Sequence, residues 1–206
     1  MSWTAARPWE GVWMSCVVGI EDPGGAWVGG DSAAVDDDDV LTLCAQPKVF
    51  SMLEDEFAVG VVDSSRPGQL VRYSLALPDA ARRQHDYQRD PDRFIATSFV
   101  EAMRKCLKRG GYAGKGEDEE ELGGHFLVAW RARLYRIESD YSFGRSSLGY
   151  DAIGSGAAVA LGALHATQGQ APRRRIEIAL AAAAEHTANV RPPFVVAHAN
   201  DATARP

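Results

Sequence analysis

Short apolar runs come in pairs along this chain, and a few turn-forming or charged residues separate the members of each pair. Glu21-Asp22-Pro23-Gly24-Gly25 separates the first two runs, and Glu54-Asp55-Glu56 separates the next two. Paired apolar runs joined in this way are typical of β-hairpins. The pattern therefore predicts three hairpins, formed by residues 16–20 with 26–29, 48–53 with 57–62, and 125–130 with 134–138.

Apolar residues at helical spacing occupy the segments between and after these hairpins. Residues 70–77 predict a helix that ends or is interrupted at Pro78. Asp90-Pro91 places a helix cap before a proline at the first helical position, and Gly110-Gly111 ends the helix that follows. Two later helices are predicted, one that Gly154-Ser155-Gly156 opens and that runs to about residue 167, and one over about 174–187.

Two further strands are predicted near residues 147–153 and 194–197. Hairpins that are segregated from helices along the chain favour an α+β fold over a doubly wound parallel sheet. A four-layer αββα sandwich, in which two antiparallel sheets lie between two helix layers, uses every predicted segment. We expect one such domain over residues 15–196, with an N-terminal arm or propeptide at 1–14 and a short polar tail at 197–206.

Composition narrows the classes of function that this domain can have. The chain has 206 residues, 46% of them hydrophobic and 24% charged, which is typical of a globular protein and excludes global disorder. The net charge of −6 argues against a general nucleic-acid partner, and no apolar run is long enough for a membrane span. Cys16, Cys44 and Cys106 form no zinc pattern. We expect reduced thiols in a cytosol-like compartment, with no metal and no cofactor.

An ordered set of short motifs resembles a known family. Segment 15–20 is followed by Trp27-Val28-Gly29-Gly30-Asp31-Ser32-Ala33, then by Lys48-Val49, and later by Ile153-Gly154-Ser155-Gly156. This set resembles mature proteasome β-type subunits and the bacterial HslV peptidases, whose mature chain opens with a nucleophilic Thr and has a Gly-Asp sixteen residues later. Asp31 lies sixteen residues after Ser15. The resemblance spans about residues 15–196 and implies the αββα fold of N-terminal nucleophile (Ntn) hydrolases.

The resemblance implies a compact site around a free N-terminal residue. Ser15 takes the position of the nucleophile, and an α-amine, whose pKa lies near neutrality, serves as the general base. Lys48 would favour the neutral amine and stabilise developing negative charge, while Asp31 would hold Lys48. Ser155 would support the hydrogen-bond network. Each residue also has an ordinary structural interpretation: Asp31 as a turn cap, Lys48 as a strand-edge charge and Ser155 as a helix cap.

Several positions differ from those of active family members. Ser15 stands where they have Thr, and Met14 precedes it where they usually have Gly at the self-cleavage point. Glycine allows the strained backbone that self-cleavage exploits, and methionine resists it. The family's glycine-rich oxyanion loop here reads Val61-Val62-Asp63-Ser64-Ser65, and a carboxylate near an oxyanion repels it. Cys16 is a second candidate nucleophile, although a buried strand cysteine is the simpler interpretation.

Two functional hypotheses follow. The first is an unprocessed, non-catalytic subunit of a homo-oligomer or larger assembly, for example a structural or virion component, in which the Trp-rich arm with Trp3, Trp9 and Trp13 makes contacts. Met14 and the 61–65 loop favour it. The alternative is a self-processing peptidase with Ser15 as N-terminal nucleophile, acting in an oligomeric ring with an unfolding ATPase as partner. The expected location is cytoplasmic or virion.

Overall fold

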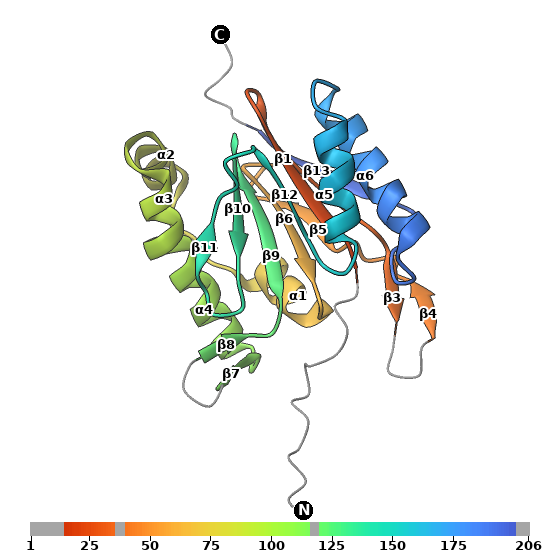
Figure 1. The fold of residues 1–206 in the computed structure, drawn as a ribbon. Coiled ribbons are helices and arrows are strands. Elements are labelled where there is room, and N and C mark those ends of the chain that lie inside the picture. Colours follow the sequence, from red (N-terminus) through yellow and green to blue (C-terminus); the bar gives the residue numbers. More distant parts are fainter. Residues whose placement is uncertain (1–14, 36–39, 116–119, 201–206) are drawn as a thin grey trace, which may run out of the picture.

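Two β-sheets lie face to face between two groups of helices (Figure 1). The structure is a computed structural model, and it describes residues 15–35, 40–115 and 120–200. The first sheet has the order β12 (Tyr150–Ile153), β1 (Val17–Asp22), β2 (Gly25–Gly30) and β13 (Val195–Asn200). The second has the order β11 (Phe143–Gly144), β10 (Arg133–Ile137), β9 (His125–Trp130), β6 (Phe57–Val62) and β5 (Val49–Met52). Every pair in both sheets is antiparallel.

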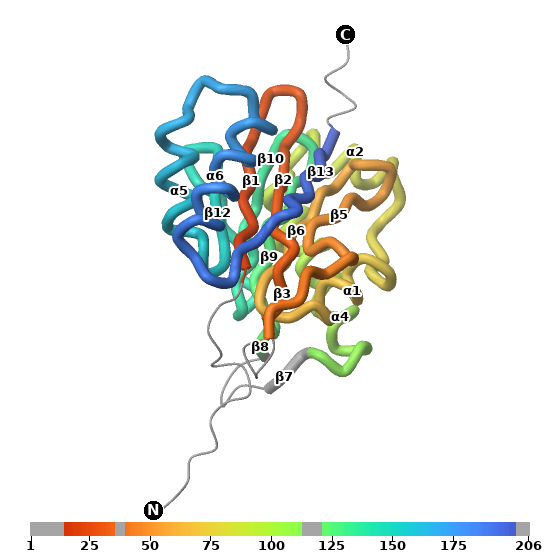
Figure 2. Tube along the Cα trace, turned by 90° about the vertical axis from the view of Figure 1, so that its right-hand side faces the viewer, coloured from red at the N-terminus to blue at the C-terminus, as the bar shows by residue number. Residues whose placement is uncertain are grey.

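Each sheet carries helices on its outer face, as Figure 2 shows from the side. Helices α5 (Ala157–Ala166) and α6 (Pro172–His186) cover the first sheet. The second is covered by α1 (Ser65–Ser74), α2 (Ala80–Arg89), α3 (Pro91–Phe94), a π-helical segment (Ile95–Phe99) and α4 (Val100–Arg109). Two small hairpins complete the described chain, β3 (Ala33–Val35) with β4 (Leu41–Leu43) and β7 (Ala113–Lys115) with β8 (Glu120–Leu122). The predicted αββα arrangement is therefore confirmed.

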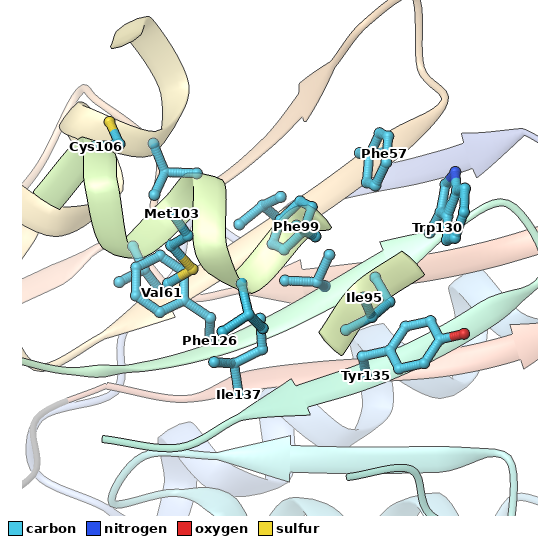
Figure 3. Close-up of a cluster of buried hydrophobic side chains, with 14 of the residues drawn as sticks. Phe57, Val61, Ile95, Phe99, Met103, Cys106, Phe126, Trp130, Tyr135 and Ile137 are labelled. Carbon is cyan, nitrogen blue, oxygen red and sulfur yellow. The ribbon is translucent and has the colours of Figure 1, made fainter. Parts of the chain in front are cut away.

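Strand alternation divides the buried side chains into three layers. In β9, Phe126, Val128 and Trp130 face the helices of the second sheet, whereas Leu127 and Ala129 face the first sheet. Figure 3 shows the aromatic and aliphatic side chains packed between the second sheet and its helices. The sequence reads as nearly continuous apolar runs in these strands because both faces of each sheet are covered.

The two sheets approach closely where their strands lack side chains. A Cβ added at Gly60 would lie 2.4 Å from Val17 and 3.0 Å from Val28, which is too close for any side chain. Glycine at this position of β6 therefore lets the second sheet pack directly on β1 and β2. The close packing brings the end of β2 and the start of β5 together at one end of the sandwich.

The predicted hairpins are confirmed as β1–β2, β5–β6 and β9–β10, and the helix after Asp90-Pro91 is present. Helix α2 was not predicted, because Arg83 is its only buried residue and it has no apolar period. The Asp79 carboxylate caps it by accepting from Arg82 N at 2.8 Å, and Arg83 pairs with Glu56. Polar contacts and an aromatic contact, between Tyr87 and Trp130, therefore hold this helix in place of an apolar face.

The predicted polar tail from residue 197 is wrong over residues 197–200. Strand β13 continues to Asn200 and pairs with β2 along its whole length. Small side chains fit this position, since Ala199 is fully buried between the two sheets. Composition alone does not distinguish a strand of small residues from a tail. Residues 1–14 and 201–206, the predicted arm and the rest of the tail, lie outside the described residues.

Candidate active site

The structure brings Ser15, Asp31, Lys48 and Ser155 together at one end of the sandwich. Ser15 precedes β1, Asp31 directly follows β2, and Lys48 directly precedes β5. The register pairs Val17 with Gly30, and Asp31 N donates to Cys16 O at 3.2 Å, so the hairpin itself sets Asp31 beside the start of β1. Lys48 comes from the other sheet. The site is thus assembled by the packing of one sheet on the other.

A continuous chain of polar contacts links three of these side chains. Lys48 Nζ donates to Ser15 Oγ at 2.5 Å and to Asp31 Oδ1 at 3.0 Å. The Asp31 side chain is fully buried, and 13% of the Lys48 side chain is exposed. A buried ion pair is stable only when its remaining hydrogen-bond capacity is satisfied. Here the backbone N–H groups of Cys16, Ala33 and Arg191 donate to the Asp31 carboxylate at 3.0, 2.9 and 3.3 Å.

Ser155 acts on the backbone of Ser15 rather than on its hydroxyl. Ser155 Oγ donates to Ser15 O at 3.3 Å, and Gly156 N donates to the same carbonyl at 3.3 Å. Ser15 itself is 4% exposed and has a φ of 118°, a backbone conformation that non-glycine residues rarely adopt. The turn that leads into α5 therefore holds the backbone carbonyl of Ser15 in place.

A pocket of about 380 Å³ opens beside Ser15 and Lys48. Strand β3 and segment 44–48 form one wall, while the end of β6, the loop after it and α1 form the other. Lining residues include Ala34, Cys44, Phe50, Val61, Asp63, Ser64, Arg66, Gln69, Arg72 and Tyr73. The Ser15 hydroxyl thus borders a space large enough for a substrate side chain.

The predicted oxyanion loop does border this pocket, and Asp63 is its unusual member. Asp63 has a φ of 78°, in the left-handed region that favours glycine. Its Oδ2 lies 3.0 Å from His125 Nδ1, and Nε2 of the same ring lies 3.4 Å from Glu138 Oε2. No motif in the sequence marks His125 as a neighbour of the site. Its place at the start of β9, opposite Val62 in the register, becomes apparent only once the strands are paired.

Cys16 lies on the other side of its strand from the pocket. Its side chain is fully buried in the layer formed with α5 and α6. Burial raises the pKa of the Cys16 thiol to about 12, and the charge of Asp31 adds to the increase while Lys48 opposes it. A thiol with this pKa carries almost no thiolate at neutral pH. The geometry therefore supports the structural interpretation of Cys16.

Across residues 15–35, 40–115 and 120–200, no group of three or more His, Cys, Asp or Glu side chains is placed to hold a metal ion. No helix in this described part of the chain combines the length and apolar character that a membrane span requires. Beside the pocket, a hydroxyl (Ser15) contacts an ammonium (Lys48) that pairs with a carboxylate (Asp31), a set of groups that can support nucleophilic acyl transfer.

Solved structures of other proteins share the fold of this chain. BPH from Thiobacillus denitrificans in complex with epoxomicin superposes with a TM-score of 0.67 at 16% sequence identity, covering 90% of this chain and 98% of that one. HslV from Trypanosoma brucei gives 0.66 at 14% identity, with 90% and 99% covered. A second BPH structure gives 0.65 at 17% identity, with 90% and 99% covered.

At the level of sequence, no protein-family model and no curated protein matches the chain. The structural likeness nevertheless extends over nearly the whole length of the similar proteins, so it describes a complete domain. The domain over residues 15–200 therefore has the αββα fold of the proteasome- and HslV-like Ntn hydrolases.

Proposed function

We propose that the chain is an amide hydrolase that uses Ser15 as an N-terminal nucleophile once the Met14–Ser15 bond has been cut. The observation that carries the proposal is the series of contacts from Asp31 through Lys48 to the Ser15 hydroxyl at the wall of a pocket. A lysine that served only as a strand-edge charge would extend into solvent, whereas the Lys48 side chain is 13% exposed. The fold shared with HslV and BPH supports the same reaction class.

Self-cleavage is the first reaction under this proposal. The Ser15 hydroxyl attacks the carbonyl carbon of Met14, the Met14–Ser15 C–N bond breaks, and the acyl group passes from nitrogen to oxygen. This shift frees the α-amine of Ser15, and water then hydrolyses the resulting ester, which releases residues 1–14 with a carboxylate at Met14 and restores the Ser15 hydroxyl. The φ of 118° at Ser15 favours this step, because strained backbone lowers the cost of breaking the adjacent bond.

Substrate hydrolysis follows the same chemistry. The free amine accepts the hydroxyl proton as Ser15 Oγ attacks the substrate carbonyl, and it then passes that proton to the leaving amine. The Lys48 ammonium favours the neutral form of the nearby amine and stabilises the developing negative charge. Asp31 holds Lys48 in position and balances its charge. Water hydrolyses the acyl ester and regenerates the Ser15 hydroxyl.

Assembly into a homo-oligomer fits this function, because an unfolded chain must be separated from folded proteins before it is cut. Exposed apolar side chains support such an assembly. Val40, Leu41 and Leu43, on and beside β4, are each about half exposed, and they stand on a hairpin that projects from the sandwich (Figure 1). An unfolding ATPase that delivers substrate is the partner expected for a ring of this kind.

Intact-mass spectrometry of the purified protein tests the proposal. We expect a loss equal to residues 1–14, with full-length mass retained in Ser15→Ala. Because the similar BPH structure contains epoxomicin, this compound is a suitable second probe. It should raise the melting temperature of the processed protein and leave that of Ser15→Ala unchanged. A full-length mass for the native protein, together with no hydrolysis of peptides, would rule the hydrolase out.

A non-catalytic subunit of a larger assembly is the second candidate, and Asp63 favours it. The Asp63 carboxylate borders the pocket that holds Ser15, where negative charge opposes formation of an oxyanion. Met14 at the cleavage point favours it as well. This candidate predicts a full-length chain that assembles in solution, and a Ser15→Ala variant that assembles equally well by analytical ultracentrifugation.

A further inference from the structure

The pocket beside Ser15 carries an excess of positive charge. Its lining includes three cations, Lys48, Arg66 and Arg72, and one carboxylate, Asp63. Lys48 pairs with Asp31, and Asp63 lies against His125. Among the described residues, no carboxylate lies within salt-bridge distance of Arg66 or Arg72. Within the part of the chain that the structure describes, these two guanidinium groups are therefore the pocket charges that no carboxylate balances.

The guanidinium of Arg72 is held in position by aromatic rings. Its Cζ lies 5.4 Å from the ring centroid of Phe50 and 5.3 Å from that of Tyr73. Arg72 is an exposed residue, but Phe50 is 5% exposed and lines the pocket, so the guanidinium lies over a ring of the pocket wall. An aromatic ring covers only the flat face of a guanidinium. The N–H groups lie in the plane of the guanidinium and therefore stay available for a bidentate contact with a carboxylate.

The same wall carries further positive character. Ser64, Ser65 and Arg66, where α1 begins, line the pocket. The first turn of α1 contains no acidic residue, and Ser64 makes no side-chain capping bond. The backbone N–H groups of this turn therefore add partial positive charge beside the two arginines.

From these charges we infer that the pocket selects an acidic side chain, glutamate or aspartate, at the substrate residue whose carbonyl Ser15 attacks. The inference rests on the proposed hydrolase function and names its substrate class. Because Ser15 lies in the pocket wall, the side chain that fills the pocket belongs to the residue whose carbonyl meets Ser15 Oγ. Arg72 is the main specificity-determining residue, and Arg66 adds to the same field.

Peptide binding tests the inference without requiring catalysis. Full-length Ser15→Ala protein is titrated against two fluorescein-labelled peptides that differ only in Glu or Gln at the selected position, and binding is followed by fluorescence anisotropy. We expect the Glu peptide to bind at least about tenfold more tightly at low salt, with the difference falling as salt rises. Equal affinities, or no detectable binding of either peptide, would overturn the inference.

Matched variants locate the effect. Arg72→Gln should remove most of the preference for Glu over Gln, and Arg72→Lys should retain part of it. Arg174→Gln is the control, because Arg174 is 67% exposed on α6, in the helix layer on the far side of the sandwich from α1 (Figure 2). A preference that survives Arg72→Gln unchanged, in protein whose melting temperature is also unchanged, contradicts the assignment to Arg72.

Measuring peptide hydrolysis distinguishes a failure of the acidic preference from a failure of the hydrolase function on which it rests. In processed protein we expect kcat/KM for the Glu peptide to exceed that for the Gln peptide at least about tenfold, and Arg72→Gln to remove the difference. Hydrolysis of both peptides at equal rates would leave the hydrolase standing and overturn the acidic preference. Binding of the Glu peptide with no hydrolysis by native protein would support the acidic pocket and overturn the hydrolase.

Discussion

Asp63 Oδ2 lies 3.0 Å from His125 Nδ1, across the end of the paired strands β6 and β9. The contact directs the carboxylate of Asp63 toward the His125 ring, although Asp63 also borders the Ser15 pocket. Asp63 keeps a left-handed backbone with a φ of 78°, a conformation that costs a non-glycine residue about 1 kcal/mol or more. The charge of Asp63 should affect catalysis, and its backbone strain should affect stability. The two effects can therefore be measured separately.

Replacement of Asp63 should raise catalytic activity. In Asp63→Gly we expect kcat to increase about tenfold, which corresponds to about 1.4 kcal/mol, because no carboxylate opposes the oxyanion. The loss of the contact with His125 and the relief of backbone strain each amount to about 1 kcal/mol, so stability should change little. Steady-state hydrolysis of peptides and urea denaturation measure the two effects.

Asp63→Asn is the matched control for that substitution. Asparagine tolerates the left-handed backbone and can contact His125, but it carries no charge. If charge is the cause, both variants are faster than the native protein. If only Asp63→Gly is faster, the cause is the backbone, and slower hydrolysis by both variants would contradict the electrostatic argument.

Lys48 should be essential for both reactions at Ser15. Lys48→Met removes the ammonium that contacts Ser15 Oγ and leaves the fully buried Asp31 carboxylate without its counterion. We expect processing and hydrolysis to fall more than about 100-fold, and the free energy of unfolding to fall by about 3 kcal/mol or more. Lys105→Met, at an exposed position of α4, should change neither. Normal processing of Lys48→Met would exclude Lys48 from the mechanism.

Glu56 should make stability depend on pH. Burial by itself would raise the pKa of Glu56, but hydrogen bonds from Arg83 and Trp130 and the charges of Arg83 and Arg131 outweigh it and hold the pKa below its usual range. A carboxyl with a lowered folded-state pKa contributes stability above its unfolded pKa of about 4.3, and this stability is lost as pH falls.

The comparison of native protein with Glu56→Gln measures this contribution. We expect the variant to be about 2 kcal/mol less stable at pH 7 by urea denaturation, and the difference to shrink below about pH 4 as Glu56 becomes protonated. Glu177→Gln, in exposed ion pairs of α6, should stay within about 0.5 kcal/mol of native at both pH values. A difference for Glu56→Gln that does not depend on pH would contradict the argument.

The three thiols should differ in reactivity. Burial is the main cause that raises the pKa of Cys16 to about 12, and burial also raises the pKa of Cys106, whereas Cys44 is half-buried at the pocket. We expect one thiol to react rapidly with a disulfide reagent in native protein and all three to react in urea. Cys44→Ser should abolish the rapid phase, and its persistence would mean that Cys16 or Cys106 is accessible.

Short-range patterns of apolar, turn-forming and capping residues determined most elements of the fold. Paired apolar runs, turn residues and the Asp90-Pro91 cap predicted the three central hairpins and the helix that ends before Gly110-Gly111, because hydrogen bonding between near neighbours forms these elements. Helix α2 and the second half of β13 escaped prediction. Their stability comes from distant partners, Glu56 for α2 and the edge of β2 for β13, which no short stretch of sequence reveals.

For the site, the sequence by itself indicated Ser15, Asp31, Lys48 and Ser155 as candidate residues, since their order along the chain resembles a known pattern, and the structure brings the four together. Only the tertiary structure decided what surrounds them. The partnership of Asp63 with His125 and the stacking of Arg72 on Phe50 join segments far apart in the chain. Such contacts depend on how one sheet and its helices pack, which the periodicity of any single segment does not encode.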